Sequence, residues 1–190
     1  MSRLSKYGIK IDKNDPKVQT LLNEVKDREF VGYSYDGADA SFELLARRLL
    51  GEIPKYLTIS KYDVSVKKES KDKINSFARA HILVDGKEVV CEGSGNGPVN
   101  ALDNAIRSNV DKIGKYSKYL KDLKLVDYKV RILNTGTEAT TRVSIESTDS
   151  RGKNWFTIGV STNIIEASFK ALIDSLDYKL FKEQAPASKL

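Results

Sequence analysis

The spacing of apolar positions divides the chain into a helical first part and a strand-rich remainder. In the first part, Val18, Leu21 and Val25 recur at helical spacing behind Asp15-Pro16, an N-cap followed by a proline that suits the first helical position. Two short amphipathic helices are predicted here, over about residues 15–28 and 38–50. Two such helices cannot bury a core alone, so we expect them to pack on a larger partner.

From Tyr56 onwards the period changes to the alternation of β-strands. Strands are predicted around Leu57–Val66, Ala78–Val84 and Val89–Cys91. Asp85-Gly86 is a hairpin turn between the second and the third of them. After these strands, Pro98 begins a predicted helix whose apolar stripe extends to Ile113, and a lysine-rich connection follows.

The same order of strands and helix then occurs a second time. Gly93 and Gly159 each lie near a strand end, and Ala101 and Ala167 follow them at the same offset. The second copy has strands around residues 126–132, 143–145 and 155–158 and a closing helix from about Ile165 to Leu176. Asn163 is a predicted N-cap of that helix. The chain therefore contains two copies of one strand-strand-strand-helix unit.

These elements predict an α+β fold with antiparallel sheets, each backed by one helix. The expected organisation is a small helical segment over residues 1–52 and a duplicated domain over 53–183, followed by a polar tail over 184–190. The first repeat covers about residues 56–114 and the second about 123–180.

Composition describes a globular chain of 190 residues that is 40% hydrophobic and 31% charged. No apolar run approaches the roughly 20 residues that a membrane span requires, and residues 1–30 lack the apolar core of a signal peptide. A single cysteine, Cys91, excludes a disulfide framework and predicts a reducing cytoplasm. The net charge is +6, but acids are interleaved with the lysines, so neither nucleic acid nor a membrane is an expected partner.

Catalytic machinery is not evident in the chain. His81 is the single histidine, and it lies in a strand beside alanines, where a structural role is the usual one. Neither a metal-ligating His or Cys cluster nor a nucleophile elbow is present, so we expect no catalytic residue, no metal and no cofactor. The glycine spacing also differs from dinucleotide-binding and P-loop fingerprints. These absences favour a binding function.

The loop Gly93–Leu102 is the strongest candidate for a binding site. Its glycines are expected to allow positive φ or the close approach of a ligand. Since Pro98 suits the first helical position, the N–H groups of Gly97, Val99 and Asn100 would point out of a helix N-terminus, where a carboxylate fits. Two related loops are expected to face each other or a symmetry mate and to hold a small zwitterion.

Four segments of this sequence resemble a known family. Gly95–Ala101, Leu125–Tyr128 and Gly159–Ser168 are similar to the C-terminal regulatory domain of the 2-isopropylmalate synthases. Gly37–Leu45, which follows Tyr33-Ser34-Tyr35, is similar to the linker subdomain of the citramalate synthase branch. The linker subdomain and the regulatory domain that these segments resemble together account for nearly the whole chain.

The resemblance implies an allosteric domain that forms a homodimer and binds the end-product amino acid of its pathway. In that family, a separate barrel domain binds a divalent metal and condenses acetyl-CoA with a 2-oxo acid. The barrel is absent from this chain, so we expect no activity from the chain alone. The citramalate branch implies isoleucine as the feedback effector, and leucine is the alternative.

The resemblance also implies which residues contact the effector. They are Gly95, Gly97, Val99, Asn100, Leu125, Tyr128 and Val160. Asp127 is a candidate partner for the ammonium group, or else a solvated acid at a strand edge. Tyr128 is either an effector contact or an aromatic that packs on the sheet, as its counterpart Tyr62 would.

Two other functions fit the same elements. Three strands followed by a helix also occur in double-stranded-RNA-binding domains, but those domains need lysines at the start of the helix. Here the segment Pro98–Asp103 has no basic residue. The other alternative is a dimerisation module that binds no ligand.

Overall fold

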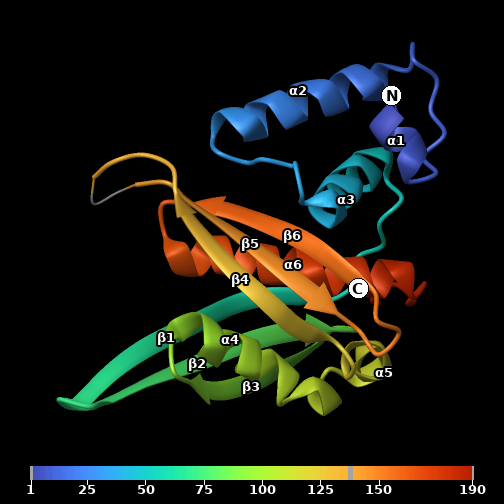
Figure 1. The fold of residues 1–190 in the computed structure, drawn as a ribbon. Helices are drawn as coiled ribbons and strands as arrows, with labels where there is room; N and C mark the ends of the chain where they lie inside the picture. The colour runs from blue at the N-terminus through green and yellow to red at the C-terminus, as the bar shows by residue number, and fades with distance from the viewer. Residues whose placement is uncertain (1, 137–138, 190) are drawn as a thin grey trace. The chain divides into compact units, whose positions relative to one another are not determined.

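The computed structural model describes residues 2–136 and 139–189 (Figure 1). The chain forms two compact units. One, here called the composite unit, combines Met1–Ile53 with Lys124–Tyr178, and the other, here called the repeat-1 unit, combines Pro54–Leu123 with Lys179–Leu190. The N-terminal helices therefore belong to the same compact unit as most of the second repeat.

The predicted helices and strands occur in the predicted order, and the structure adds short helices at residues 2–6 and 117–120. The helices are α1 (Ser2–Lys6), α2 (Pro16–Phe30), α3 (Asp39–Leu50), α4 (Pro98–Arg107), α5 (Ser117–Leu120) and α6 (Ile164–Lys182), with short 3₁₀ turns η1 (Val110–Lys112) and η2 (Gly114–Tyr116). The strands are β1 (Thr58–Ser70), β2 (Lys73–Val84), β3 (Lys87–Gly95), β4 (Lys124–Ile132), β5 (Thr141–Thr148) and β6 (Asn154–Ser161). They form two antiparallel sheets, ordered β1-β2-β3 and β4-β5-β6. The predicted α+β fold with duplicated βββα units is confirmed.

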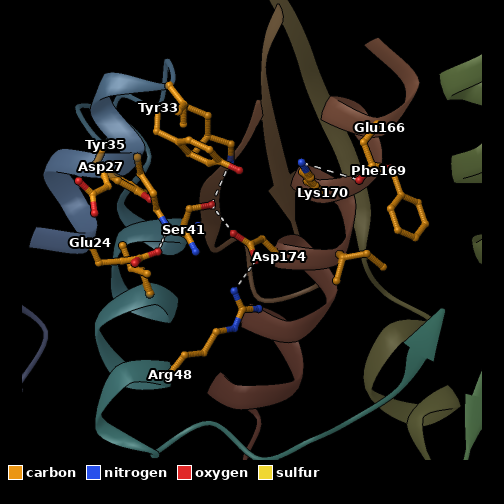
Figure 2. Close-up of a pocket in the computed structure, with 15 residues that line it drawn as sticks. Glu24, Asp27, Tyr33, Tyr35, Ser41, Arg48, Glu166, Phe169, Lys170 and Asp174 are labelled. Atoms are coloured by element: carbon orange, nitrogen blue, oxygen red, sulfur yellow. Dashed lines mark hydrogen bonds and ion pairs between the residues drawn. The ribbon is translucent and has the colours of Figure 1, made fainter. Parts of the chain in front are cut away.

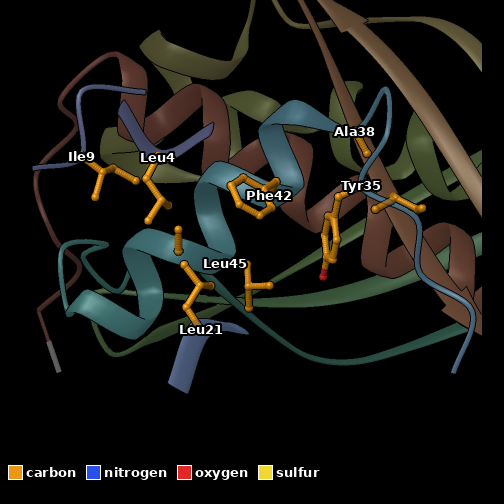
Figure 3. Close-up of a cluster of buried hydrophobic side chains, with 9 residues drawn as sticks. Leu4, Ile9, Leu21, Tyr35, Ala38, Phe42 and Leu45 are labelled. Atoms are coloured by element: carbon orange, nitrogen blue, oxygen red, sulfur yellow. The ribbon is translucent and has the colours of Figure 1, made fainter. Parts of the chain in front are cut away.

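In the composite unit, the sheet β4-β5-β6 packs on α6 with one face. Thr157 Oγ1 donates a hydrogen bond to the Ala171 carbonyl oxygen at 2.8 Å, and Trp155 Nε1 donates to Ser175 Oγ at 3.1 Å. Ile158, which points to the other face of β6, joins an apolar cluster with the N-terminal helices (Figure 3). The cluster consists of Leu4, Ile9, Leu21, Tyr35, Ala38, Phe42, Leu45, Ala46 and Ile158. The expectation that the short helices need a larger partner is therefore met within this unit.

A polar network joins α3 to α6 beside this cluster. Arg48 contacts both Asp174 and Asp177 at 2.8 Å, and Ser41 Oγ donates to Asp174 at 2.7 Å. Ser41 Oγ also accepts a hydrogen bond from the backbone N–H of Ile158 at 3.0 Å, on the edge strand of the sheet. Burial raises the pKa of Asp177 to about 6, although the Arg48 guanidinium opposes that shift. The network fixes the position of α3 at the sheet edge.

The repeat-1 unit has α4 on one face of the sheet β1-β2-β3. Small residues line this contact on both elements, because Ala78, Ala80, Ala101 and Ala105 are fully buried. The predicted helix to Ile113 is wrong, since α4 ends at Arg107 and 3₁₀ turns follow. Ile113 is nevertheless fully buried, as its place in the apolar stripe indicated.

Residues after α6 pack on the repeat-1 unit, although their composition indicated a polar tail. The backbone N–H of Ser188 donates to the Lys55 carbonyl oxygen at 2.7 Å. Tyr116 donates its hydroxyl to the Pro186 carbonyl oxygen at 2.9 Å, and Lys115 donates to that of Ala187 at 2.6 Å. The lysine-rich connection thus holds a fully buried tyrosine and anchors the end of the chain.

The expectation that the loop glycines adopt positive φ is wrong. Gly93, Gly95 and Gly97 all lie outside the left-handed region, and Gly97 has φ −152°. Gly93 is required for a different reason, because a Cβ there would overlap with the α4 backbone, 2.6 Å from Ala105 Cα. A Cβ on Gly97 would meet no atom within 4 Å. Close contact between helix and sheet, rather than an unusual turn, explains why residue 93 is a glycine.

Gly159 performs the same task in the second repeat. A Cβ on Gly159 would overlap with the Ala167 carbonyl oxygen in α6 and lie 2.9 Å from the backbone nitrogen of Ala171. Ala167 and Ala171 are both fully buried. The glycine and alanine matches that indicated a duplication therefore mark the same helix–sheet contact in each repeat.

Gly159→Ala is expected to lower the free energy of unfolding by about 2–4 kcal/mol, because the added methyl group meets backbone atoms that cannot rotate away. Gly97→Ala is the matched control, and its cost is expected to stay below about 1 kcal/mol, because the site is open and its φ suits any residue. Urea denaturation of both variants measures the difference. Equal losses in the two variants would contradict the assigned packing role.

Candidate functional site

The N-terminus of α4 lacks a side-chain cap. Gly97 is the N-cap residue, with φ −152° and ψ 167°, and Pro98 follows at the first helical position. The Gly97 carbonyl oxygen accepts the first helical bond, from the N–H of Ala101 at 2.9 Å. The N-cap residue makes no side-chain hydrogen bond to the first turn of this helix. The N–H groups of Val99 and Asn100 are thus directed to an acceptor from outside the helix.

The equivalent position of the second repeat is filled by the chain itself. Asn163 Oδ1 accepts hydrogen bonds from the N–H groups of Ile165 at 2.9 Å and Glu166 at 3.2 Å. Ser161 Oγ accepts from the N–H of Asn163 at 3.1 Å. The sequence prediction that Asn163 caps its helix is confirmed. Only one of the two matched helix N-termini is therefore open to an external anion.

Glycines replace both of these polar side chains in the first repeat. By the same offset that relates Gly93 to Gly159, Gly95 matches Ser161 and Gly97 matches Asn163. A Cβ on Gly95 would overlap with Asn100 Oδ1 and lie 2.7 Å from the backbone nitrogen of Ala101. The loop thus brings its backbone against the first turn of α4, and its N-cap residue has no side chain.

The side chain of Asn100 lies over this loop. Its Oδ1 accepts a hydrogen bond from the N–H of Asn96 at 3.2 Å. Asn104 Nδ2 binds the Ser94 carbonyl oxygen at 2.9 Å and ties the loop to the middle of α4. Gly95, Gly97, Val99 and Asn100, predicted as effector contacts, therefore lie together in the repeat-1 unit.

Leu125 and Tyr128 belong to the composite unit and project toward α6. Leu125 pairs with Ser147 across β4 and β5, and Tyr128 pairs with Ile145. Tyr128 shares a hydrogen bond with Ser168 Oγ of α6 at 2.9 Å. This bond provides the sheet-packing role that was the alternative for Tyr128, and the effector role of both residues stays a prediction.

Asp127 and Val160 lie on the opposite face of the same sheet. Lys129 Nζ contacts Asp127 at 2.9 Å, and this hydrogen bond holds the pKa of the carboxyl below its ordinary value. Val160 pairs with Arg142, whose Nε donates to the Gly32 carbonyl oxygen at 2.7 Å. Because neighbouring strand residues alternate between faces, the structure does not bring Val160 to the face that carries Tyr128.

A cavity of about 620 Å³ in the composite unit lies between α2, α3 and α6 (Figure 2). None of the predicted effector residues lines it. Its cations are paired: Arg28 contacts Glu24 at 2.6 Å, Arg48 contacts Asp174 at 2.8 Å and Lys170 contacts Glu166 at 3.8 Å. Because its positive charges are neutralised, this cavity is a weaker candidate for a carboxylate ligand than the α4 N-terminus.

The side chains of types that bind metal ions do not gather into a cluster in residues 2–136 and 139–189. Within these ranges, no group of three His, Cys, Asp or Glu side chains is arranged to hold a metal ion. His81 Nδ1 lies 3.2 Å from Glu88 Oε2, and Ser60 Oγ donates to the same carboxylate at 3.1 Å. The histidine therefore takes part in a cross-strand contact on the sheet surface.

Sequence reasoning missed Ser76, a buried polar residue next to the open loop. Ser76 pairs with Gly95 across β2 and β3. The Asp85-Gly86 turn fixes this register, because the strands on either side of it pair residue by residue up to Gly95. The pairing was thus available from the sequence, although the burial of Ser76 was not.

The fold defines an α+β domain of two βββα repeats that follows a helical segment. Residues 36–180 match the model of the LeuA allosteric (dimerisation) domain, and the chain belongs to this family. The resemblance to the regulatory part of the 2-isopropylmalate and citramalate synthases is thereby confirmed.

Similar proteins include several citramalate synthases. The (R)-citramalate synthase of Geobacter sulfurreducens is 42% identical over 97% of this chain and 35% of its own length. That of Aquifex aeolicus is 42% identical over 96% of this chain and 34% of its own length. The 2-isopropylmalate synthase of Clostridium acetobutylicum is 34% identical over 62% of this chain and 19% of its own length. The chain spans about a third of the length of the citramalate synthases.

None of the helices within residues 2–136 and 139–189 has both the length and the apolar character that crossing a bilayer demands.

Asn163→Ala is expected to lower the free energy of unfolding by about 1 kcal/mol, because two N–H groups of α6 lose their acceptor. Gly97→Asn is the reciprocal variant and is expected to raise it by a few tenths of a kcal/mol, on the order of a new N-cap at an open site. Urea unfolding without added amino acids measures both changes. A neutral Asn163→Ala, or a clearly destabilising Gly97→Asn, would contradict the difference between the two helix N-termini.

Proposed function

We propose that this chain is the effector-binding and dimerising part of a citramalate or 2-isopropylmalate synthase. Its effector is a branched-chain amino acid, with isoleucine favoured by the citramalate synthases among its relatives and leucine as the alternative. The observation that carries the proposal is the α4 N-terminus, which has no side-chain cap where the matched helix of the second repeat has Asn163.

The effector carboxylate is proposed to accept hydrogen bonds from the N–H groups of Val99 and Asn100. Their alignment with the helix dipole favours an anion by about 0.3–2 kcal/mol, depending on burial. Gly97 places no side chain at the N-cap position, and the carboxamide of Asn100 supplies a further polar group beside it. This geometry suits the carboxylate of any small amino acid.

Selectivity then depends on the apolar part of the site. Burial of a branched side chain contributes about 1.5–3 kcal/mol, for which Val99 is available beside the helix N-terminus. The resemblance adds Leu125, Tyr128 and Val160 as predicted contacts, with Asp127 as the predicted partner of the ammonium group. Isoleucine and leucine differ in the position of one methyl group, which a pocket distinguishes by only about 1–3 kcal/mol.

The proposed regulation is feedback inhibition of a catalytic barrel encoded outside these 190 residues. Effector binding in a homodimer would couple to the barrel with about 1–3 kcal/mol, the usual size of an allosteric coupling. The barrel would condense acetyl-CoA with a 2-oxo acid, as the family resemblance implies. The single cysteine, Cys91, is a buried thiol, which supports the reducing cytoplasm as the compartment.

Membership in an allosteric domain family favours this function over an RNA-binding module. A dimerisation module without a ligand is the remaining competitor. It predicts a stable dimer whose melting temperature ignores isoleucine, leucine and valine, whereas an effector-binding domain is stabilised by at least one of them.

Gly97→Asp is expected to abolish binding of isoleucine and leucine, because it places a carboxylate where the ligand carboxylate is proposed to sit. The substitution leaves the fold intact, since a side chain at Gly97 meets open space and aspartate is a good N-cap. Isothermal calorimetry on the 190-residue chain measures the loss. Asn163→Asp is the control, because it adds the same charge at the other helix N-terminus and is expected to retain binding.

Two results would remove the proposal. One is the absence of heat and of any thermal shift when the wild-type chain meets isoleucine, leucine or valine. The other is an affinity in Gly97→Asp equal to that of the wild-type chain.

A further inference from the structure

The strand beside the α4 N-terminus carries a buried hydroxyl group without a partner. Ser76 lies in β2 and is 1% exposed. Its Oγ has no hydrogen-bond partner in the part of the chain that the structure describes. Buried polar groups are nearly always paired, so an unpaired one in a native fold needs an explanation.

Ser76 is directed toward the first turn of α4. In an antiparallel pair, residues directly opposite each other project from the same face of the sheet. The residue opposite Ser76 is Gly95, and a Cβ at Gly95 would point into Asn100 and Ala101. The hydroxyl of Ser76 therefore lies on the face of the sheet that carries the first turn of α4.

The second repeat shows what the first repeat lacks at this place. The pair equivalent to Ser76 and Gly95 is Thr141 and Ser161. There, Ser161 Oγ accepts a hydrogen bond from Asn163, and Asn163 caps α6. In the first repeat both acceptors are replaced by glycine, while the hydroxyl in the neighbouring strand is kept. The Ser76 hydroxyl and the uncapped N–H groups of α4 thus both lack a side-chain acceptor.

We propose that Ser76 is a further contact of the effector, donating its O–H to the carboxylate bound at the N–H groups of Val99 and Asn100. This inference rests on the proposed function. The Asn100 carboxamide, whose Oδ1 lies against Gly95 and accepts from the N–H of Asn96 at 3.2 Å, covers this position in the structure. The bound carboxylate displaces the Asn100 carboxamide and brings an oxygen within hydrogen-bond distance of Ser76 Oγ, which Asn100 Oδ1 does not reach. The ligand class that meets this arrangement is a small carboxylate with a short branched apolar side chain.

The test is calorimetry of the full 190-residue chain with isoleucine and with leucine, for the wild type, Ser76→Ala and Ser94→Ala. Ser94 is the matched control, because it precedes Gly95 and pairs with Phe77 on the opposite face of the same sheet. Ser76→Ala is expected to weaken binding by about tenfold or more, the usual effect of losing a hydrogen bond to a charged group. Ser94→Ala is expected to bind as the wild type does.

Urea unfolding without amino acids separates a binding role from a structural one. Because Ser76→Ala removes a buried hydroxyl that makes no hydrogen bond, its unfolding midpoint is expected to equal or exceed that of the wild type. A lower midpoint together with unchanged affinity would make Ser76 a structural residue and overturn the inference.

Failures of the two proposals are distinguishable. If the wild-type chain binds neither isoleucine nor leucine, the proposed function falls and the inference falls with it. If the wild type binds and Ser76→Ala binds equally well, only the inference about Ser76 is overturned.

Discussion

The first turn of an α-helix presents backbone N–H groups that need acceptors, and the two repeats meet this need differently. In the second repeat, Asn163 accepts from two of these groups, and Ser161 supports Asn163. In the first repeat, Gly95 and Gly97 stand at the matching positions, and no side chain caps the helix. Of these two matched helices, only α4 therefore has first-turn N–H groups without a side-chain cap.

Close contact between helix and sheet creates the setting for this difference. The helices α4 and α6 lie so close to their sheets that a Cβ on Gly93 or Gly159 would overlap with helix backbone atoms. Gly93 and Gly97 are therefore glycines for different reasons. Gly93 is required by packing, whereas the open space around Gly97 gives it no structural necessity. A glycine that packing does not require, at a position where a capping side chain is usual, is the strongest indication of a ligand site.

The sequence predicted the elements well, because periodicity and caps report local physics. It predicted both βββα repeats and the Asn163 cap. It did not predict the end of α4, where Asn109 Nδ2 donates to the carbonyl oxygens of Ala105 and Glu92 at 2.8 Å and competes with further helical bonds. Apolar spacing alone continues past that point, since Ile113 is buried whether it lies in a helix or a 3₁₀ turn.

Other features depend on tertiary contacts that composition does not report. The pattern indicates a polar tail over residues 184–190, yet the backbone of residues 186–188 is hydrogen-bonded to the Lys55 carbonyl oxygen, to Lys115 Nζ and to the Tyr116 hydroxyl. The candidate site shows the same limit. Gly95, Gly97, Val99 and Asn100 follow one another in the loop and therefore come together, whereas Tyr128 and Val160 lie in different strands and face opposite sides of their sheet. Ser76 shares the face of Ala78 and Ala80, but the pattern does not report that its hydroxyl lacks a hydrogen-bond partner among the described residues.

The central claim is that the α4 N-terminus, and not the matched end of α6, receives a carboxylate. An NMR titration of the ¹⁵N-labelled chain with isoleucine, repeated with leucine, tests this claim most directly. We predict that the backbone amide signals of Val99 and Asn100 shift in a saturable way, while those of Ile165 and Glu166 stay in place. Saturable shifts at Ile165 and Glu166 with none at Val99 and Asn100 would contradict the account.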